Sequence, residues 1–206
     1  MGKVGKMSVI LGYKAEDKLY LAADNRLSEK DGTFICDNER KIIEINSHLA
    51  VAFAGNAGTQ ALFGEFVKGL KNANDFKMED ILFNIDAMFM SLKINKDREY
   101  AINILNSSSY FIVAGKDKNN DNGIYAVSYV NGKLGDTKTE MILFPPLGAD
   151  MQTCSNIYVK NIHMFPQNFL QKTVKEISDI CNTVSPSCDI WTYNFVTDNS
   201  SMEHFS

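Results

Sequence analysis

The sequence predicts an α+β protein built as a four-layer αββα sandwich, in which two antiparallel sheets stack between two layers of helices. Three observations predict this fold. The strand-like segments come in two groups, a pair of helical segments follows each group, and one more strand follows the second pair. This order differs from the strand–helix alternation of a doubly wound parallel sheet, whereas stacked antiparallel sheets with flanking helix pairs accommodate it. No linker or change of composition interrupts the pattern, so residues 8–197 are expected to form a single domain.

The first group consists of strands. Residues 8–14 and 18–24 are apolar runs around a short polar turn, which is typical of a hairpin. Short strands are expected at residues 33–36 and 40–45 around another polar turn. Residues 48–54 (HLAVAFA) are almost continuously apolar, which favours a buried strand. That strand ends in a glycine-rich corner, where a helix is expected to follow.

Two helices and the second group of strands come next. Residues 59–71 and 78–93 carry apolar side chains at helical spacing, and both helices are expected to lie on the same outer face of the molecule. Residues 109–114 and 124–130 predict strands. The dipeptide Asn131-Gly132 then predicts a type I′ hairpin leading into a further strand that runs to about residue 144.

The last part of the chain predicts two more helices and a closing strand. The helices are expected at residues 148–159 and 167–184, and the strand at residues 188–197. Residues 198–206 form a polar segment that is expected to fray, as chain ends commonly do.

Composition excludes several classes of function. The 206 residues carry a net charge of −4, so the chain lacks the basic field that binding to nucleic acid or to an anionic membrane needs. No apolar run approaches the ~20 residues of a membrane span. The four cysteines form no C-x-x-C pair and the three histidines are far apart, which gives no support for a metal site or a cofactor. We expect a cytoplasmic protein with reduced cysteines.

Three stretches of sequence carry a resemblance to a known family. Residues 21–26 read LAADNR, residues 41–55 read KIIEINSHLAVAFAG, and residues 115–117 (GKD) follow an apolar strand. Together they resemble a subunit of the proteasome family, which includes the bacterial HslV peptidase. The resemblance extends over residues 8–193, and it implies the N-terminal-nucleophile hydrolase fold, an αββα sandwich.

The resemblance also implies a chemistry and the residues that perform it. In this family of threonine proteases the nucleophile is the hydroxyl of the first residue of the mature chain, and its own α-amine acts as the base. Ser8 stands where the family has this threonine. Asp24 matches the aspartate that holds a lysine, Lys41 matches that lysine, and Gly55 matches the glycine whose N–H forms the oxyanion hole.

Each of these residues also has an ordinary structural explanation. Ser8 fits a strand, Lys41 a solvated strand edge, Asp24 the cap of a turn, and Gly55 a tight corner. Their joint occurrence at these spacings favours the catalytic interpretation.

Two motifs in the second half of the chain depart from the family pattern. Where the family has Asp-x-x-Ser-Gly-Gly, residues 182–187 read NTVSPS, so Ser185 is kept and Asn182 replaces the aspartate. Where the family has Gly-Ser-Gly, residues 148–150 read GAD, so Ala149 replaces the serine. Both changes fall in the network that supports the nucleophile, and we therefore expect slow turnover.

Catalysis by Ser8 requires that Ser8 be the first residue. Residues 1–7 are either a propeptide removed by autoproteolysis or an extension upstream of a true start at Met7, and we favour the start at Met7. The methionine before a small residue such as Ser8 is normally trimmed, which would free the α-amine.

Three functions remain open at this point. The first is a peptidase or amidohydrolase that uses Ser8 within a proteasome-like homo-oligomeric ring, acts on a peptide or protein substrate and works with an ATPase unfoldase. The second is a non-catalytic structural subunit of such a ring. The third is a free-standing enzyme that hydrolyses a small amide.

Overall fold

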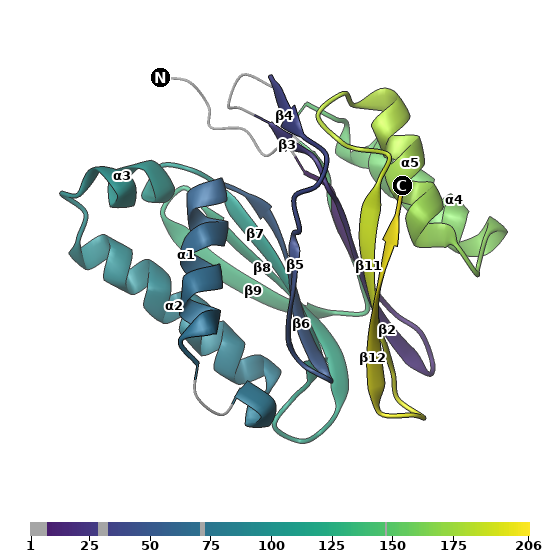
Figure 1. The fold of residues 1–206 in the computed structure, drawn as a ribbon, viewed down its shortest axis with the longest axis horizontal. Helices are drawn as coiled ribbons and strands as arrows, with labels where there is room; N and C mark the ends of the chain where they lie inside the picture. The colour runs from purple at the N-terminus through teal and green to yellow at the C-terminus, as the bar shows by residue number, and fades with distance from the viewer. Residues whose placement is uncertain (1–7, 29–32, 71–72, 147) are drawn as a thin grey trace.

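The computed structural model describes residues 8–28, 33–70, 73–146 and 148–206, and it consists mainly of two five-stranded antiparallel sheets (Figure 1). The sheets stack face to face, and each outer face carries a layer of helices. The predicted α+β sandwich is therefore confirmed. Residues 1–7, the predicted extension or propeptide, lie outside the described residues.

The first sheet brings the two ends of the described chain together. Its strand order is β10-β1-β2-β11-β12, so the last two strands pair beside one of the first. The strands are β1 (Ile10–Lys14), β2 (Lys18–Asp24), β10 (Met141–Phe144), β11 (Cys188–Asn194) and β12 (Asn199–Phe205).

The second sheet is a meander, in which each strand pairs with the next one along the chain. Its strand order is β5-β6-β7-β8-β9, and all neighbours are antiparallel. Asn131 and Gly132, between β8 and β9, have φ of 53° and 78°, as the predicted type I′ turn requires. The strands of this sheet are β5 (Ile42–Asn46), β6 (Leu49–Gly55), β7 (Ser109–Lys116), β8 (Asn122–Val130) and β9 (Lys133–Thr139), and a separate short pair is formed by β3 (Leu27–Ser28) and β4 (Phe34–Cys36).

Helices form the two outer layers, on the left and on the right of Figure 1. Residues of α1, α2 and α3 share one apolar cluster with the second sheet, and residues of α4 and α5 share another with the first sheet. The prediction that the first two helices lie on one outer face is confirmed. The helices are α1 (Ala57–Lys68), α2 (Met78–Ile94), α3 (Glu99–Leu105), α4 (Met151–Met164) and α5 (Phe169–Ile180), with a short 3-10 turn at Ala73–Asp75.

Strand β6 explains how the layers are held together. Val51 and Phe53 belong to the cluster beneath α1–α3, whereas the alternating Ala50, Ala52 and Ala54 belong to the cluster between the two sheets. Both faces of the strand are buried, which accounts for its continuous apolar sequence. Small alanines on the inner face let the two sheets approach closely, and the large Trp191 of the first sheet lies in the same inner cluster.

Several local predictions differ from the structure. The strand predicted to run from the Asn131-Gly132 turn to about residue 144 is two strands, β9 in the second sheet and β10 in the first. The prediction that the chain frays from Asp198 is wrong, because β12 pairs with β11 over its whole length. Helix α3 was not expected, because its apolar repeat covers only two turns. Helix α4 begins later than predicted because Asp150 caps it, accepting a hydrogen bond from the Thr153 N–H at 2.7 Å.

Within the described parts of the chain, no helix is long and apolar enough to cross a membrane.

Candidate active site

A buried ion pair joins the two sheets at one end of the sandwich. Asp24 is the last residue of β2 in the first sheet, and Lys41 directly precedes β5 in the second. The Lys41 Nζ atom lies 3.0 Å from Asp24 Oδ2, and the two side chains are only 4% and 0% exposed. The sequence places both residues at the ends of apolar runs, so the strands carry their charged groups into the interior.

Backbone groups surround the Asp24 carboxylate. The N–H of Val9 donates to Oδ1 at 2.9 Å, and the N–H groups of Arg26 and Ser185 donate to Oδ2 at 3.0 and 3.4 Å. Burial raises the pKa of Asp24, while the Lys41 ammonium and the N–H donors of Arg26 and Val9 act in the opposite direction. A buried carboxylate needs these partners, because burying an unpaired charge is costly.

The same contacts locate Ser8. Two hydrogen bonds join Val9 and Asp24. Besides the bond from the Val9 N–H to the carboxylate, the Asp24 N–H donates to the Val9 carbonyl oxygen at 3.2 Å. Ser8 is the residue directly before Val9, and it is buried, with 7% of its surface exposed. The carboxylate that holds Lys41 thus also fixes the peptide group that follows Ser8.

Gly55 forms the corner between β6 and α1. Its φ of +122° is a conformation that side chains rarely adopt, and an added Cβ would lie 2.4 Å from the Ser108 carbonyl oxygen. Asn56 then caps α1 by accepting from the N–H groups of Gly58 and Thr59. Gly55 lies two residues after Phe53, whose N–H donates to the Lys41 carbonyl oxygen at 2.9 Å, so this corner is close to the ion pair along the ladder.

Ser185 belongs to the loop that follows α5. Its side chain is buried, its Oγ lies 2.7 Å from Ser187 Oγ, and the Ser187 N–H donates to it at 3.1 Å. In the structure Asp24 therefore contacts both Lys41 and Ser185, and Ser8 is attached to Asp24 through Val9. The side chain of Asn182 in the same loop is exposed.

The sequence prediction missed one member of this cluster, Arg26. Its carbonyl oxygen accepts from Lys41 Nζ at 2.6 Å, and its guanidinium binds both carboxylate oxygens of Asp37 at 2.7 and 2.8 Å. A third donor, Nη1, reaches the carbonyl oxygen of Asn182 at 2.5 Å. Hydrogen bonds from Arg26, with a smaller contribution from Ser185, lower the pKa of Asp37. The only sequence feature that could have indicated Arg26 was its place at the end of the LAADNR segment.

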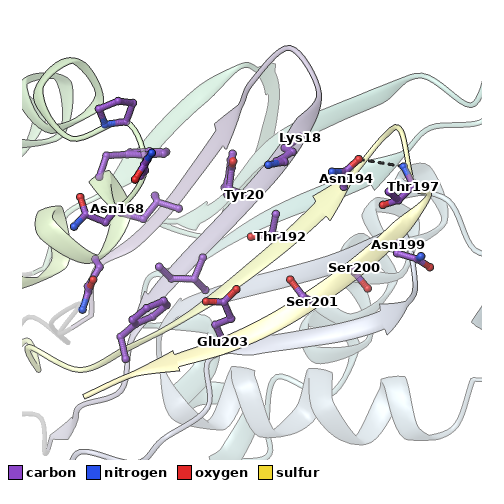
Figure 2. A pocket seen from close by; sticks show the side chains of 17 residues that line it. Lys18, Tyr20, Asn168, Thr192, Asn194, Thr197, Asn199, Ser200, Ser201 and Glu203 are labelled. Atoms are coloured by element: carbon purple, nitrogen blue, oxygen red, sulfur yellow. Dashed lines mark hydrogen bonds between the residues drawn. The ribbon is translucent and has the colours of Figure 1, made fainter.

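A well-formed cavity lies elsewhere. A space of about 600 Å³ opens on the outer side of the first sheet, between β2, β11 and β12 and the start of α5 (Figure 2). Polar side chains such as Asn168, Thr192 and Glu203 line it, and none of the five predicted site residues does. Among the residues that the structure describes, no three His, Cys, Asp or Glu side chains gather in a group that could hold a metal ion.

The sandwich of two antiparallel sheets between two layers of helices is consistent with the fold of a proteasome subunit. A sequence model of the proteasome subunit family matches residues 6–134, more than half of the chain, and the chain belongs to this family. The matched part contains Ser8, Asp24, Lys41 and Gly55. No match is found among curated proteins. Subunits of this family typically assemble into rings with related subunits.

Proposed function

We propose that this chain is a hydrolytic subunit of a proteasome-like assembly, in which Ser8 attacks amide bonds once it has become the first residue. The observation that carries the proposal is the buried Lys41–Asp24 pair, 3.0 Å apart, attached to the peptide group next to Ser8. A stable fold does not by itself require a buried ion pair here, which favours a catalytic use of the pair. Replacing a buried ion pair by apolar residues is often neutral or stabilising.

Lys41 is suited to activate a hydroxyl. An ammonium group has three N–H donors, and two of them point to Asp24 Oδ2 and to the carbonyl oxygen of Arg26. In the proposed mechanism the third donates to Ser8 Oγ and stabilises the negative charge that develops there. Asp24 acts through Lys41, because its carboxylate holds and orients the ammonium group.

The proposed reaction has two stages. The Ser8 Oγ forms a bond to the amide carbon, its proton passes to the Ser8 α-amine, and the Gly55 N–H stabilises the oxyanion. The C–N bond then breaks, and the α-amine gives its proton to the leaving amine. Water attacks the resulting ester, with the α-amine again taking a proton, and the carboxylic acid leaves as Ser8 is restored. Ser185, buried beside Asp24, is proposed to orient the α-amine.

The nitrogen of Ser8 decides whether this chemistry is available. An α-amine has a pKa near 7.7–8.0 and is poised to act as a base at about neutral pH. While Met7 is attached, that nitrogen is an amide and cannot accept a proton. We therefore propose that a start at Met7, followed by trimming, or removal of residues 1–7 precedes activity.

A non-catalytic structural subunit is the second candidate. It is favoured by the exposed side chain of Asn182, at a position where the resemblance places an aspartate. Identical or related subunits in a ring and an ATPase unfoldase are the proposed partners, with peptides or proteins as substrates. A cytoplasmic location stays a prediction.

The test is a covalent peptide epoxyketone, which needs both a hydroxyl and a free α-amine on the same residue. Four chains are compared: the chain started at Met7, the chain started at Met1, and the Met7-start chain carrying Ser8→Ala or Ser178→Ala. Ser178 is a half-buried serine on α5 and provides the matched control. Intact mass first establishes which residue is the N-terminus in each case.

The proposal predicts an adduct of one probe on the Met7-start chain and on its Ser178→Ala variant, and none on Ser8→Ala. A Met1-start chain whose mass includes residues 1–7 should remain unlabelled. Labelling of Ser8→Ala at the rate of its parent would exclude Ser8 as the nucleophile. Absence of any adduct on folded protein with a free Ser8 amine would establish the structural-subunit alternative. Turnover of small amides but not of peptides would favour the free-standing amidase.

A further inference from the structure

Helix α2 carries a second apolar stripe that the fold does not bury. Its inner side, with residues such as Ile85 and Phe89, packs in the cluster against the second sheet. On the other side Phe83, Met90 and Ile94 are 72%, 50% and 80% exposed, and Ala87 between them is exposed as well. Large exposed apolar groups gathered along one helix face are uncommon in a monomer and indicate an interaction surface.

The spacing of this stripe is that of a helix-pairing seam. Positions 83, 87, 90 and 94 are separated by 4, 3 and 4 residues, the alternation found at the core positions of coiled coils. The helix has 17 residues and is therefore about 25 Å long, enough to present the whole seam to one other helix. The stripe thus fits a partner helix better than a small molecule.

The residues that flank the seam indicate which partner helix fits. On one flank lie Asp86 and Lys93, seven residues apart and both exposed, and on the other flank lie the uncharged Asn84 and Ser91. In an antiparallel pair of identical helices, each flank meets the same flank of the other helix. Asp86 of one protomer then faces Lys93 of its partner, and the two-fold axis repeats the ion pair. A parallel pair would instead bring each charge beside an uncharged residue.

We propose that α2 is a self-association surface through which two copies of this chain pair antiparallel about a two-fold axis. In this register Phe83 of one protomer lies opposite Ile94 of its partner, and Ala87 lies opposite Met90, so that small and large side chains alternate at the centre. The interface is isologous, as in most homodimers. The inference goes beyond the proposed hydrolysis and does not depend on it.

A single helix pair buries less than the roughly 1,200 Å² of a stable interface, so the contact between two isolated chains should be weak and rapidly reversible. In a ring, several such contacts would form together between two rings and reinforce one another. The same surface can therefore pair chains or pair rings.

Charge reversal tests the register. Asp86→Lys and Lys93→Asp each place like charges across the proposed axis, and each variant alone should self-associate about tenfold more weakly than the parent. An equimolar mixture of the two variants restores two opposite-charge pairs, as does the double variant within one chain. Sedimentation equilibrium over a range of protein concentrations measures all four cases, at low salt because salt screens exposed pairs.

The control reverses a comparable charge pair on a different helix. Glu65 and Lys68 on α1 are exposed and 2.7 Å apart, and Glu65→Lys and Lys68→Glu should leave self-association unchanged. A seam variant, Phe83→Glu, should abolish pairing while circular dichroism remains that of the folded protein. Restored association in the mixture of Asp86→Lys and Lys93→Asp supports the proposal. A parent that stays monomeric at its highest soluble concentration, or a mixture no better than its components, overturns it. An effect of Phe83→Glu without rescue by the mixture would also overturn the antiparallel register.

Discussion

Residues 8–58 hold the candidate site with buried side chains, whereas residues 182–187 reach it mainly through backbone atoms. In the first region the Lys41 and Asp24 side chains are almost fully buried and contact each other. In the second, the N–H of Ser185 and the carbonyl oxygen of Asn182 make the contacts to Asp24 and to Arg26. A backbone contact survives a change of side chain. This difference explains how residues 182–187 can depart from the family pattern while their backbone still contacts Asp24 and Arg26.

The comparison predicts a large effect at Lys41. Changing Lys41→Met leaves the Asp24 carboxylate buried without its counter-ion, and we expect the free energy of unfolding to fall by about 3–5 kcal/mol. Lys160, paired with Glu176 at 2.5 Å between α4 and α5, offers the matched control in the C-terminal half, because its side chain is 46% exposed. Lys160→Met should cost less than about 1 kcal/mol.

Urea unfolding followed by circular dichroism measures both changes. If Lys160→Met proved as damaging as Lys41→Met, burial would not be what distinguishes the two pairs, and the contrast between the two regions would fail.

A second test compares two glycines with positive φ, Gly55 in the first region and Gly148 in the segment before α4. Gly55 has φ of +122°, and a Cβ added there would lie 2.4 Å from the Ser108 carbonyl oxygen. Gly148 has φ of +83°, and an added Cβ would have no atom within 4 Å. Gly148→Ala should cost only the backbone conformation, about 1–2 kcal/mol. Gly55→Ala should cost about 1–3 kcal/mol for the backbone, and the overlap with Ser108 adds to that. Thermal or urea unfolding measures the loss of stability in the two variants. Equal losses would mean that the backbone at Gly55 can shift to relieve the overlap.

The sequence was most informative where a candidate residue borders an apolar strand. Asp24 and Gly55 end such strands and Lys41 directly precedes one, so their positions in the fold followed from the strand pattern and from the resemblance. Strand β12 was missed because its sequence, NSSMEHF, is polar. The strand lies at the edge of its sheet and most of its residues are exposed, so no apolar pattern marks it. The link between Arg26 and Asp37 was missed because it depends on how the chain folds back between β2 and β5, which no periodicity records.

The smallest predicted effect concerns this Arg26–Asp37 link, which holds the guanidinium that also donates to the Asn182 carbonyl oxygen in the second region. Hydrogen bonding to Arg26 lowers the pKa of Asp37, and Ser185 contributes in the same direction. The unfolded chain has an aspartate pKa near 3.9, so between the folded and unfolded values the unfolded state binds more protons. The stabilisation is therefore present above about pH 4 and is lost as the pH falls through the lower folded value.

Asp37→Asn removes this titration. Between about pH 6 and pH 3, the free energy of unfolding of the wild type should therefore fall further than that of Asp37→Asn. The Asp37 side chain is 36% exposed and solvent screens the pair, so we expect this difference to be less than about 1 kcal/mol. Urea unfolding at both pH values measures the difference. Asp136→Asn, a change at an exposed carboxylate on β9, is the control and should keep the pH dependence of wild type. If Asp37→Asn lost stability on acidification as steeply as wild type, the Arg26–Asp37 pair would not be holding the loop of residues 182–187 against Asp24, and the two regions of the site would be joined by their backbone contacts alone.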